Sequence, residues 1–196
     1  DVWLFDVDRR VASRFTADPA TDSTPVWSPD GRRIVFSSNR KGNLDLYQKD
    51  SNGGSDETVL LSDRTDKTAE SWSSDGRFLL YGVSAAKSPT HTNDVWVLPL
   101  DGDRKPFPFL QSRFSERYGR FSPDGKWVTY ESNESGSQEI YVTPFPGPGG
   151  KWRISEAGGR WARWRRDGRQ ISYIAPDNKL MAVDVVQQLE VVEIEH

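Results

Sequence analysis

The chain has 196 residues, which is long enough to bury a core and suits one domain or two small ones. Its net charge of −3 gives no bulk attraction to nucleic acid or to an anionic membrane, so neither is an expected partner. The sequence contains no cysteine, which excludes disulfides and thiol catalysis, and no apolar run approaches the ~18 residues of a membrane span.

In chain order, the first segment predicts two strands, at residues 1–6 and 12–16. It begins as a strand already under way and lacks the features of a signal peptide, so we expect the chain to be cut from a longer protein. Residues 24–62 predict four short antiparallel strands, because β-branched and aromatic runs alternate with Gly, Asn, Asp and Pro. These strands are expected at 24–28, 32–37, 44–50 and 57–61.

Three further units repeat this order of strands. No window carries apolar residues three and four apart over three turns, so no helix is predicted. The expected strands are 70–72, 77–81, 94–98 and 106–110, then 119–121, 126–130, 139–142 and 151–154, then 162–164, 170–174, 179–183 and 189–194.

A five-residue signature marks each complete unit: a bulky aromatic, two small or basic residues, and Asp-Gly. The aspartates of successive copies lie 45, 49 and 43 residues apart, and a period in the forties indicates a repeat protein. Four-stranded sheets at this period, without helices, predict an all-β fold, a β-propeller whose sheets form its blades. A β-sandwich also has strands at short spacing, but it does not require the same signature at every fourth strand.

Within the signature, Asp-Gly provides the chemistry of a tight turn, and the aromatic is expected between neighbouring blades, where each ring buries ~150–250 Å². The predicted turn residues are Asp30, Gly31, Asp75, Gly76, Asp124, Gly125, Asp167 and Gly168. The predicted inter-blade residues are Trp27, Trp72, Phe121 and Trp164.

These residues resemble the TolB-like propellers, a family with WD-like repeats whose blades carry Trp/Phe-Ser-Pro-Asp-Gly before a Ser-Asn-Arg-like loop and an Asp-Leu-Tyr-like strand. The resemblance covers the whole chain, and residues 28–31 and 122–125 keep Ser-Pro-Asp-Gly intact. The copy at 73–76 lacks the Pro, and the copy at 165–168 lacks both Ser and Pro. Asp-Gly remains in all four copies, which preserves the turn.

Residues 96–107 and 141–152 carry a narrower resemblance, to the propeller that follows the kinase domain of bacterial serine/threonine kinases of the eukaryotic-like type. This resemblance implies a bacterial sensor or interaction domain, and it favours a periplasmic or extracytoplasmic location over the cytoplasm. The kinase signatures themselves are absent from the sequence, so no kinase activity is assigned to these residues.

The repeat predicts a single propeller domain with about four and a half blades. The family usually closes six or seven blades, so we expect an incomplete ring whose open edges invite self-association or a crystal contact. The expected units are an outer half-blade at 1–19 and complete blades at 20–66, 67–112, 113–157 and 158–196.

The sequence offers few residues for catalysis or metal binding. Its two histidines are His91, in a polar loop, and His196, the last residue. A zinc site would need more histidines or cysteines than this, and neither histidine stands in a context that indicates a Ser-His-Asp triad. The recurring carboxylates are interpreted as structural, because they stand at turns and at strand starts. We therefore predict no catalytic residue, no metal and no cofactor.

Residues 160–169 are the densest cluster, with five arginines and two tryptophans. One interpretation is a basic aromatic surface for an anionic ligand; the other, which we favour, packs the tryptophans between blades and leaves the arginine heads in solvent. By position in a propeller, Glu70, Arg120 and Arg163 are the candidates to face the mouth of the central channel. The Pro/Gly-rich run at 145–150 is expected to connect the third and fourth strands of a blade rather than to form a polyproline recognition element.

The favoured function is a non-catalytic protein-interaction or ligand-sensing module that binds a protein or peptide, within a larger signalling protein or translocation-type assembly. One alternative is the gating propeller of a prolyl-oligopeptidase-like hydrolase whose catalytic domain lies elsewhere, since no Gly-x-Ser-x-Gly elbow is present. Another is a binder or lyase of anionic sugars, which requires histidines that the chain lacks. These functional assignments rest on analogy between folds.

Overall fold

The computed structural model describes residues 1–84, 92–147, 149–188 and 191–195. Within these residues the chain forms one two-stranded and four four-stranded antiparallel sheets and no helix. The strands are β1 (Trp3–Asp6), β2 (Val11–Arg14), β3 (Asp22–Trp27), β4 (Arg33–Lys41), β5 (Asn43–Asp50), β6 (Thr58–Leu61), β7 (Asp66–Trp72), β8 (Phe78–Ser84), β9 (Asn93–Pro99), β10 (Phe107–Leu110), β11 (Glu116–Phe121), β12 (Trp127–Ser132), β13 (Glu139–Pro144), β14 (Trp152–Arg153), β15 (Arg160–Trp164), β16 (Gln170–Ile174), β17 (Leu180–Gln188) and β18 (Val191–Glu195).

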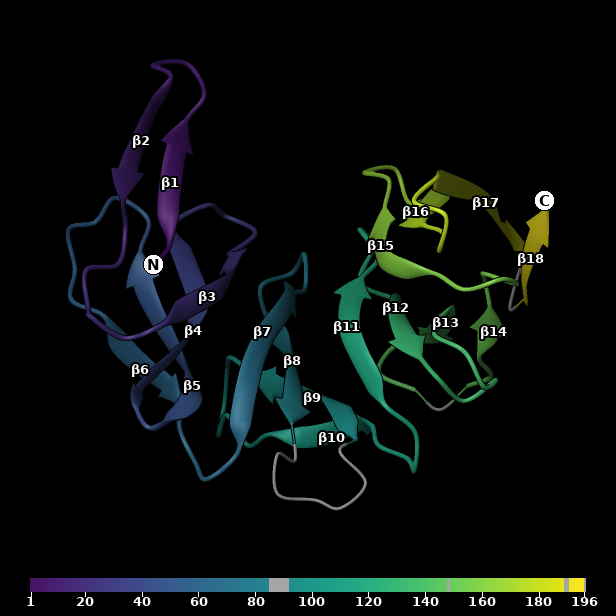
Figure 1. Ribbon diagram of the computed structural model, residues 1–196, viewed down its shortest axis with the longest axis horizontal. Helices are drawn as coiled ribbons and strands as arrows, with labels where there is room; N and C mark the ends of the chain where they lie inside the picture. Colours follow the sequence, from purple (N-terminus) through teal and green to yellow (C-terminus); the bar gives the residue numbers. More distant parts are fainter. Residues whose placement is uncertain (85–91, 148, 189–190, 196) are drawn as a thin grey trace.

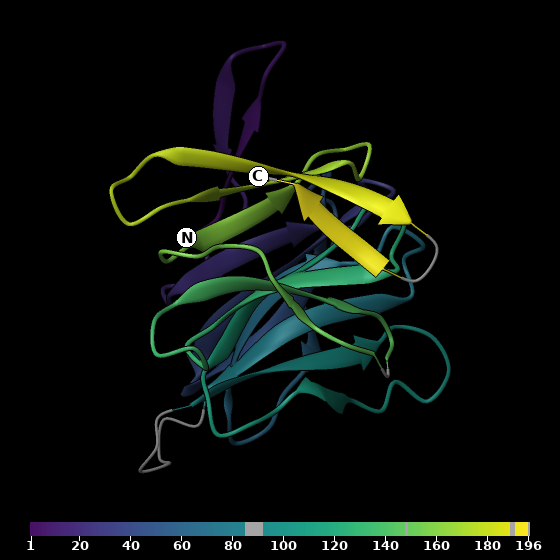
Figure 2. The ribbon, with the colours of Figure 1, turned by 90° about the vertical axis from the view of Figure 1, so that its right-hand side faces the viewer.

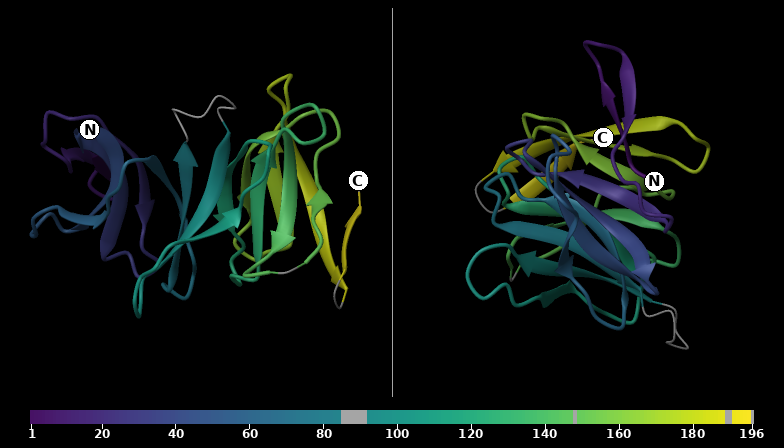
Figure 3. Two further views of the ribbon diagram at one scale, coloured as in Figure 1. Left: turned by 90° about the horizontal axis from the view of Figure 1, so that it is seen from below. Right: turned by 90° about the vertical axis from the view of Figure 1, so that its left-hand side faces the viewer.

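The sheets follow one another in chain order around an open arc, and Figure 3 shows this row of sheets from below. Strands are neighbours in each complete sheet in the order of the chain, so its first strand forms one edge. These first strands, β3, β7, β11 and β15, lie on the inner side of the arc, and each contacts the next (Figure 1). We call the surface they form the concave wall. The prediction of an all-β, partial propeller is confirmed.

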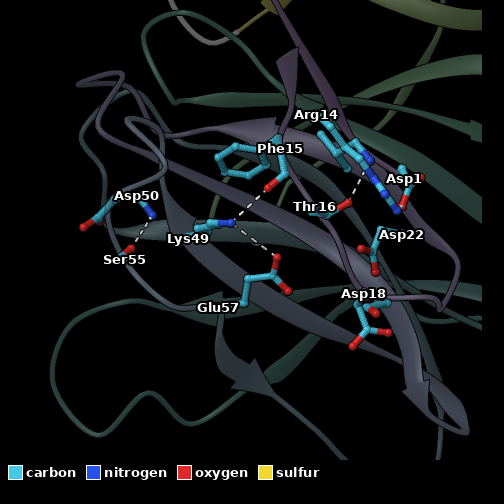
Figure 4. Close-up of polar contacts among 12 residues, drawn as sticks. Asp1, Arg14, Phe15, Thr16, Asp18, Asp22, Lys49, Asp50, Ser55 and Glu57 are labelled. Carbon is cyan, nitrogen blue, oxygen red and sulfur yellow. Dashed lines mark hydrogen bonds and ion pairs between the residues drawn. The ribbon is translucent and has the colours of Figure 1, made fainter.

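The two ends of the arc differ. The β15–β18 sheet presents its broad outer face at the C-terminal end (Figure 2), whereas the β1–β2 hairpin projects beyond the first complete blade. Polar contacts hold the base of this hairpin to that blade (Figure 4). Within the hairpin segment, Val2 N–H donates to Thr16 Oγ1 at 2.9 Å, and Lys49 Nζ of the blade donates to the carbonyl of Phe15 at 2.9 Å. Lys49 also pairs with Glu57 at 3.5 Å, so one lysine ties the two segments together.

The cores lie between neighbouring blades rather than within one sheet. Val35 and Leu46 of the first complete blade pack with Trp72 and Leu79 of the second. Both faces of the first three complete sheets are therefore covered, which explains why middle strands such as β4 bury consecutive side chains instead of alternate ones. In the last sheet, one face of which is open, β16 buries alternate side chains. The same arrangement recurs at the next two junctions, around Phe121 and around the β15–β18 sheet.

Some strand limits differ from the predicted ones. β14 holds two residues instead of the expected four, although Ile154 N–H still donates to the carbonyl of Ile140 at 2.7 Å. β17 runs to Gln188 instead of ending at 183, because it pairs with β18 in a longer hairpin than the sequence predicted. Outer strands are not buried on both faces, so their limits are weakly encoded in an apolar pattern.

Candidate binding site on the concave wall

The turn that follows each innermost strand uses its polar side chains locally. In the second complete blade, Ser73 Oγ donates to Asp75 Oδ1 at 2.6 Å and accepts the N–H of Phe78 at 2.9 Å. Asp75 Oδ1 also accepts the N–H of Arg77 at 3.0 Å, and the serine bond is the main reason that its pKa is lowered. The same contacts occur in the turns at 28–33 and 122–127. These carboxylates are occupied by the fold.

The fourth turn has a different residue in the serine position and reaches a similar geometry. Arg165 donates two hydrogen bonds to the carboxylate of Asp167, from Nε at 2.9 Å and from Nη2 at 2.8 Å. This contact is the main cause that lowers the pKa of Asp167 to about 2. Gly168 takes a φ of 74°, as the glycines of the other three turns do, which explains why Asp-Gly persists where Ser and Pro do not.

The signature aromatics occupy the same register position in all four blades, each opposite the residue seven positions later. Trp72, Phe121 and Trp164 pack against clusters that include the preceding blade. Trp27 departs from the expected inter-blade packing, because 51% of its surface is exposed. The sheet that precedes Trp27 in this chain has two strands, β1 and β2, and no described inner strand covers the indole.

On the N-terminal side of its signature aromatic, each innermost strand contains a β-bulge. In three blades the bulge holds a residue with a left-handed backbone that is not glycine: Thr24 with φ 49°, Tyr118 with φ 57° and Trp161 with φ 59°. An aromatic residue in this conformation costs roughly 1–2 kcal/mol. Tyr118 and Trp161 are 39% and 50% exposed, and both belong to strands of the concave wall.

Buried carboxylates from the preceding blade hold the bulges at Tyr118 and Trp161. Glu70 on β7 accepts the N–H of Tyr118 on Oε1 and the N–H of Gly119 on Oε2, both at 2.7 Å. Glu131 on β12 accepts the N–H of Trp161 at 2.6 Å. Each carboxylate thereby satisfies backbone donors that a bulge removes from the sheet ladder.

The two carboxylates reach the same place from different strands. Glu131 and Gly82 are equivalent, because each follows a tyrosine in the middle strand at the same register. A Cβ on Gly82 would lie 2.7 Å from Thr68 Oγ1 and 2.9 Å from Glu70 Oε1, so the missing side chain makes room for both the threonine hydroxyl and the carboxylate of Glu70. In the first complete blade the equivalent residue is Ser37, whose Oγ accepts the N–H of Ala69 at 3.0 Å.

Electrostatics at this junction are strongly perturbed. Burial raises the pKa of Glu70 to about 7, against the lowering effect of its two backbone hydrogen bonds and of Arg120. Burial also raises the pKa of Glu131. The pKa of Arg120 falls to about 10, mainly through burial and also through the nearby charge of Arg163.

The structure brings together two of the three predicted channel-mouth residues. Arg120 donates from Nη1 to the backbone carbonyl of Glu70, so the two residues belong to one contact between β7 and β11. Glu70 is buried instead of facing a channel mouth, because its carboxylate turns into the bulge of the next blade. Arg163 is exposed on β15, where Nη1 bonds the carbonyl of Ala162 at 2.8 Å.

The sequence analysis did not single out Arg117 and Tyr118, and for Trp161 it favoured packing between blades over an exposed basic aromatic surface. The guanidinium of Arg117 lies 5.1 Å from the ring centre of Tyr118, and that of Arg160 lies 4.5 Å from the ring of Trp161. Tyr118, Arg117 and residues of β3 and β7 line a cavity of about 280 Å³. The available signal was an aromatic three residues before the signature aromatic in two blades, preceded each time by arginine. Of the cluster at 160–169, Trp164 packs between blades and Trp161 does not.

Among the described residues, no three or more His, Cys, Asp or Glu side chains gather as a group able to hold a metal ion. The candidates His91 and His196 lie outside the described residues. The same described part of the chain has no helix with the length and apolar character needed to cross a membrane.

Comparisons with known proteins identify relatives of the fold. The family model PD40, the TolB beta propeller domain, matches residues 1–102. An uncharacterized protein of Agrobacterium fabrum, Atu1656, is 26% identical over 140 residues, which cover 66% of this chain and 46% of that protein. The Tol-Pal system protein TolB of Wolinella succinogenes is 24% identical over 162 residues, covering 77% of this chain and 37% of that protein. The chain thus spans less than half the length of these relatives.

Among solved structures, the crystal structure of TolB from Acinetobacter baumannii superimposes with a TM-score of 0.75. The match covers 98% of this chain and 47% of that one at 20% sequence identity, so it shows the fold alone.

Proposed function

The chain belongs to the TolB β-propeller domain family, and from that premise we propose that it is a non-catalytic binding module that takes a protein or peptide segment on its concave wall. One observation carries the proposal. Tyr118 and Trp161 expose their rings on this wall, and each is held in a left-handed backbone by a buried carboxylate of the preceding blade.

The conformational cost of these two residues supports a binding role. A glycine would fit the same backbone without strain, yet the chain places a tyrosine and a tryptophan there and stabilises them with Glu70 and Glu131. Strained residues of this kind cluster at sites of function. Rigid aromatic side chains with a polar tip are also the most frequent anchors of protein interfaces.

The charge of the wall indicates the chemistry of the segment. Glu70 and Glu131 are buried and use carboxylate oxygens on backbone N–H groups, and Glu131 also pairs with Arg117 at 3.4 Å. This leaves Arg160, whose guanidinium lies over Trp161, and the exposed Arg163 as positive charges of the wall that have no ion-pair partner among the described residues. A guanidinium next to an aromatic face binds carboxylates and planar apolar groups together. The favoured segment is therefore an acidic peptide with aromatic or apolar residues.

A selection from a library of random peptides, followed by affinity measurement of the enriched sequences, tests this proposal. Tyr118→Ala and Trp161→Ala are each expected to weaken the selected peptides about tenfold, in the range of interface anchors. Trp3→Ala is the matched control, because Trp3 is equally exposed but lies on the β1–β2 hairpin. Peptides that lose as much affinity with Trp3→Ala as with Trp161→Ala would contradict the assignment of the site.

We further propose that the blades meet near residues 19, 66, 112 and 157 and that the chain is attached to a signalling kinase or a translocation assembly. Its open sheet edges are expected to associate with each other. The domain order of the parent gene tests the attachment, and sedimentation of the purified chain tests the association of edges.

A further inference from the structure

Two successive junctions between blades differ in charge at one register position. Lys67 on β7 and Glu116 on β11 are equivalent, because each pairs with the residue two positions after the tyrosine of the middle strand. Each of these residues lies close to an aspartate of the preceding blade: Lys67 to Asp45 on β5, and Glu116 to Asp94 on β9. The two aspartates are equivalent, because each occupies the same register position in the third strand of its blade.

At the first junction the charges are matched. Lys67 Nζ lies 3.2 Å from Asp45 Oδ1 and 2.7 Å from Asp63 Oδ1, and it donates to the carbonyl of Thr65 at 2.7 Å. The lysine side chain is fully buried. A buried ammonium is tolerated only with partners of this kind, so the junction is complete in itself.

At the second junction the equivalent positions hold two carboxylates, Glu116 in place of Lys67 and Asp94 in place of Asp45. Ser112 Oγ donates to Glu116 Oε1 at 2.5 Å, and Gln111 Nε2 donates to Asp94 Oδ2 at 3.0 Å. The other oxygens, Glu116 Oε2 and Asp94 Oδ1, are buried and have no hydrogen-bond partner among the described residues. Glu116 is only 4% exposed, so a buried carboxylate oxygen is left without the hydrogen bond that such an acceptor normally has.

The surroundings accentuate this excess of negative charge. Burial raises the pKa of Glu116, and the charges of Asp94 and Glu134 raise it further, while Lys151 acts in the opposite direction. Lys151 is itself paired with Glu134, so its charge is largely used. A bound cation beside Glu116 would offset the cost of ionising that carboxyl group.

A cavity of about 730 Å³ opens at Glu116 toward the outer strand β10, and neither Tyr118 nor Trp161 lines it. Its lining combines Glu116 and the ion pair of Lys151 and Glu134 with aromatic and proline residues. The aromatic residues that line it are Phe107, Phe109, Phe114 and Tyr130. The cavity therefore has largely apolar walls and, at Glu116, a carboxylate with one oxygen that has no hydrogen-bond partner among the described residues.

We propose that this cavity binds a primary ammonium group carried on an apolar or aromatic body. The ammonium donates to Glu116 Oε2 and is attracted by Asp94, and so takes the role that Lys67 Nζ plays at the first junction. The apolar body lies against Phe107, Phe114 and Tyr130. This site is independent of the peptide-binding role of the concave wall, because the two share no residue.

Titration calorimetry with 2-phenylethylamine tests the site, with 2-phenylethanol as the neutral probe of the same shape. The amine is expected to bind at least about tenfold more tightly than the alcohol, since a charge-assisted hydrogen bond replaces a neutral one. Glu116→Gln keeps an acceptor for Ser112 but removes the charge, and it is expected to weaken the amine about tenfold. Asp101→Asn, an exposed turn carboxylate, is the matched control and leaves binding unchanged.

A second variant tests the comparison of junctions without a ligand. Glu116→Lys places a cation opposite Asp94 as Lys67 is placed opposite Asp45, and it is expected to abolish amine binding and to raise the melting temperature. If Glu116→Lys does not fold, the binding of the Glu116→Gln variant still decides the question.

The source of the ammonium is distinguished by a blocked dipeptide, acetyl-Phe-Lys-amide, with acetyl-Phe-norleucine-amide as its uncharged match. Binding of the lysine dipeptide but not of the free amine assigns the site to a lysine of a protein partner, and the reverse assigns it to a small amine. Equal binding of charged and uncharged probes, binding of Ca²⁺ alone, or full retention of affinity in Glu116→Gln would overturn the proposal.

Discussion

The two ends of the innermost strands follow different rules. At the turn end, three blades use the same Ser–Asp contacts with the same distances to within a few tenths of an ångström, and the fourth substitutes one arginine. At the bulge end, each junction finds its own acceptor: Ser37 in the first, Glu70 in the second and Glu131 in the third.

This difference separates what the repeat maintains from what each blade varies. The turn is a local structure of about six residues, so the same short sequence produces it wherever it occurs. The bulge is completed by the neighbouring blade, so its chemistry can change as long as one backbone N–H finds an acceptor. The variable end is also the one that exposes Tyr118 and Trp161, which links variation to the proposed binding role.

The largest expected effect concerns the aromatic that stands between the two ends. Trp72→Ala should lower the free energy of unfolding by about 3–5 kcal/mol, because the indole is buried between two blades. Trp27→Ala, at the equivalent position but half exposed, should cost about 1 kcal/mol. Denaturant unfolding of both variants measures the difference. Equal losses would mean that the two indoles share one environment.

The next effect tests whether Glu70 and Glu131, which come from different strands, do the same work of accepting the backbone N–H groups of a bulge in the next blade. Glu70→Ala should cost about 3 kcal/mol, because two buried N–H groups lose their acceptor. Gly82→Glu alone should also destabilise, since its side chain meets the carboxylate of Glu70. The double variant rebuilds the arrangement of Glu131 and should be more stable than the sum of the single changes predicts. Strict additivity in denaturant unfolding would refute the equivalence.

A pH series examines the same carboxylate. The folded-state pKa of Glu70 is raised to about 7, above the 4.5 of an unperturbed glutamate, so the folded state binds the proton more tightly than the unfolded state. Its contribution to stability is therefore complete below pH 4.5 and is lost as the pH rises toward 7, by about 2–3 kcal/mol. Melting curves of the wild type and Glu70→Gln should converge or cross in this window; parallel curves would exclude the shift.

The smallest effect concerns the turn end. Ser73→Ala removes a buried hydroxyl that bonds Asp75 and the N–H of Phe78, and should cost about 1 kcal/mol. Arg165→Ala removes the substitute contact in the fourth turn, which is exposed, and its effect on thermal unfolding should be smaller. A larger loss of stability for Arg165→Ala than for Ser73→Ala would show that Arg165 stabilises the protein through contacts beyond this turn.

Much of the fold could be read from the sequence, because its signals are local. Trp72 followed by Asp75-Gly76 predicts a strand and a turn within five residues, and the three further copies of this pattern predict the propeller. The site was less accessible. Glu70 was correctly placed on an innermost strand, but its carboxylate points into the next blade, a direction that depends on the empty position at Gly82, twelve residues away.

The sequence by itself determined the all-β character, the period of the sheets and the chemistry of the four turns, since these depend on residues close together in the chain. Only the tertiary structure decided which aromatics are buried, which carboxylates hold a bulge and which remain unmatched, because contacts between blades set them. Trp27 and Trp72 share a signature and a register, and the number of strands in the sheet before each one accounts for their different burial.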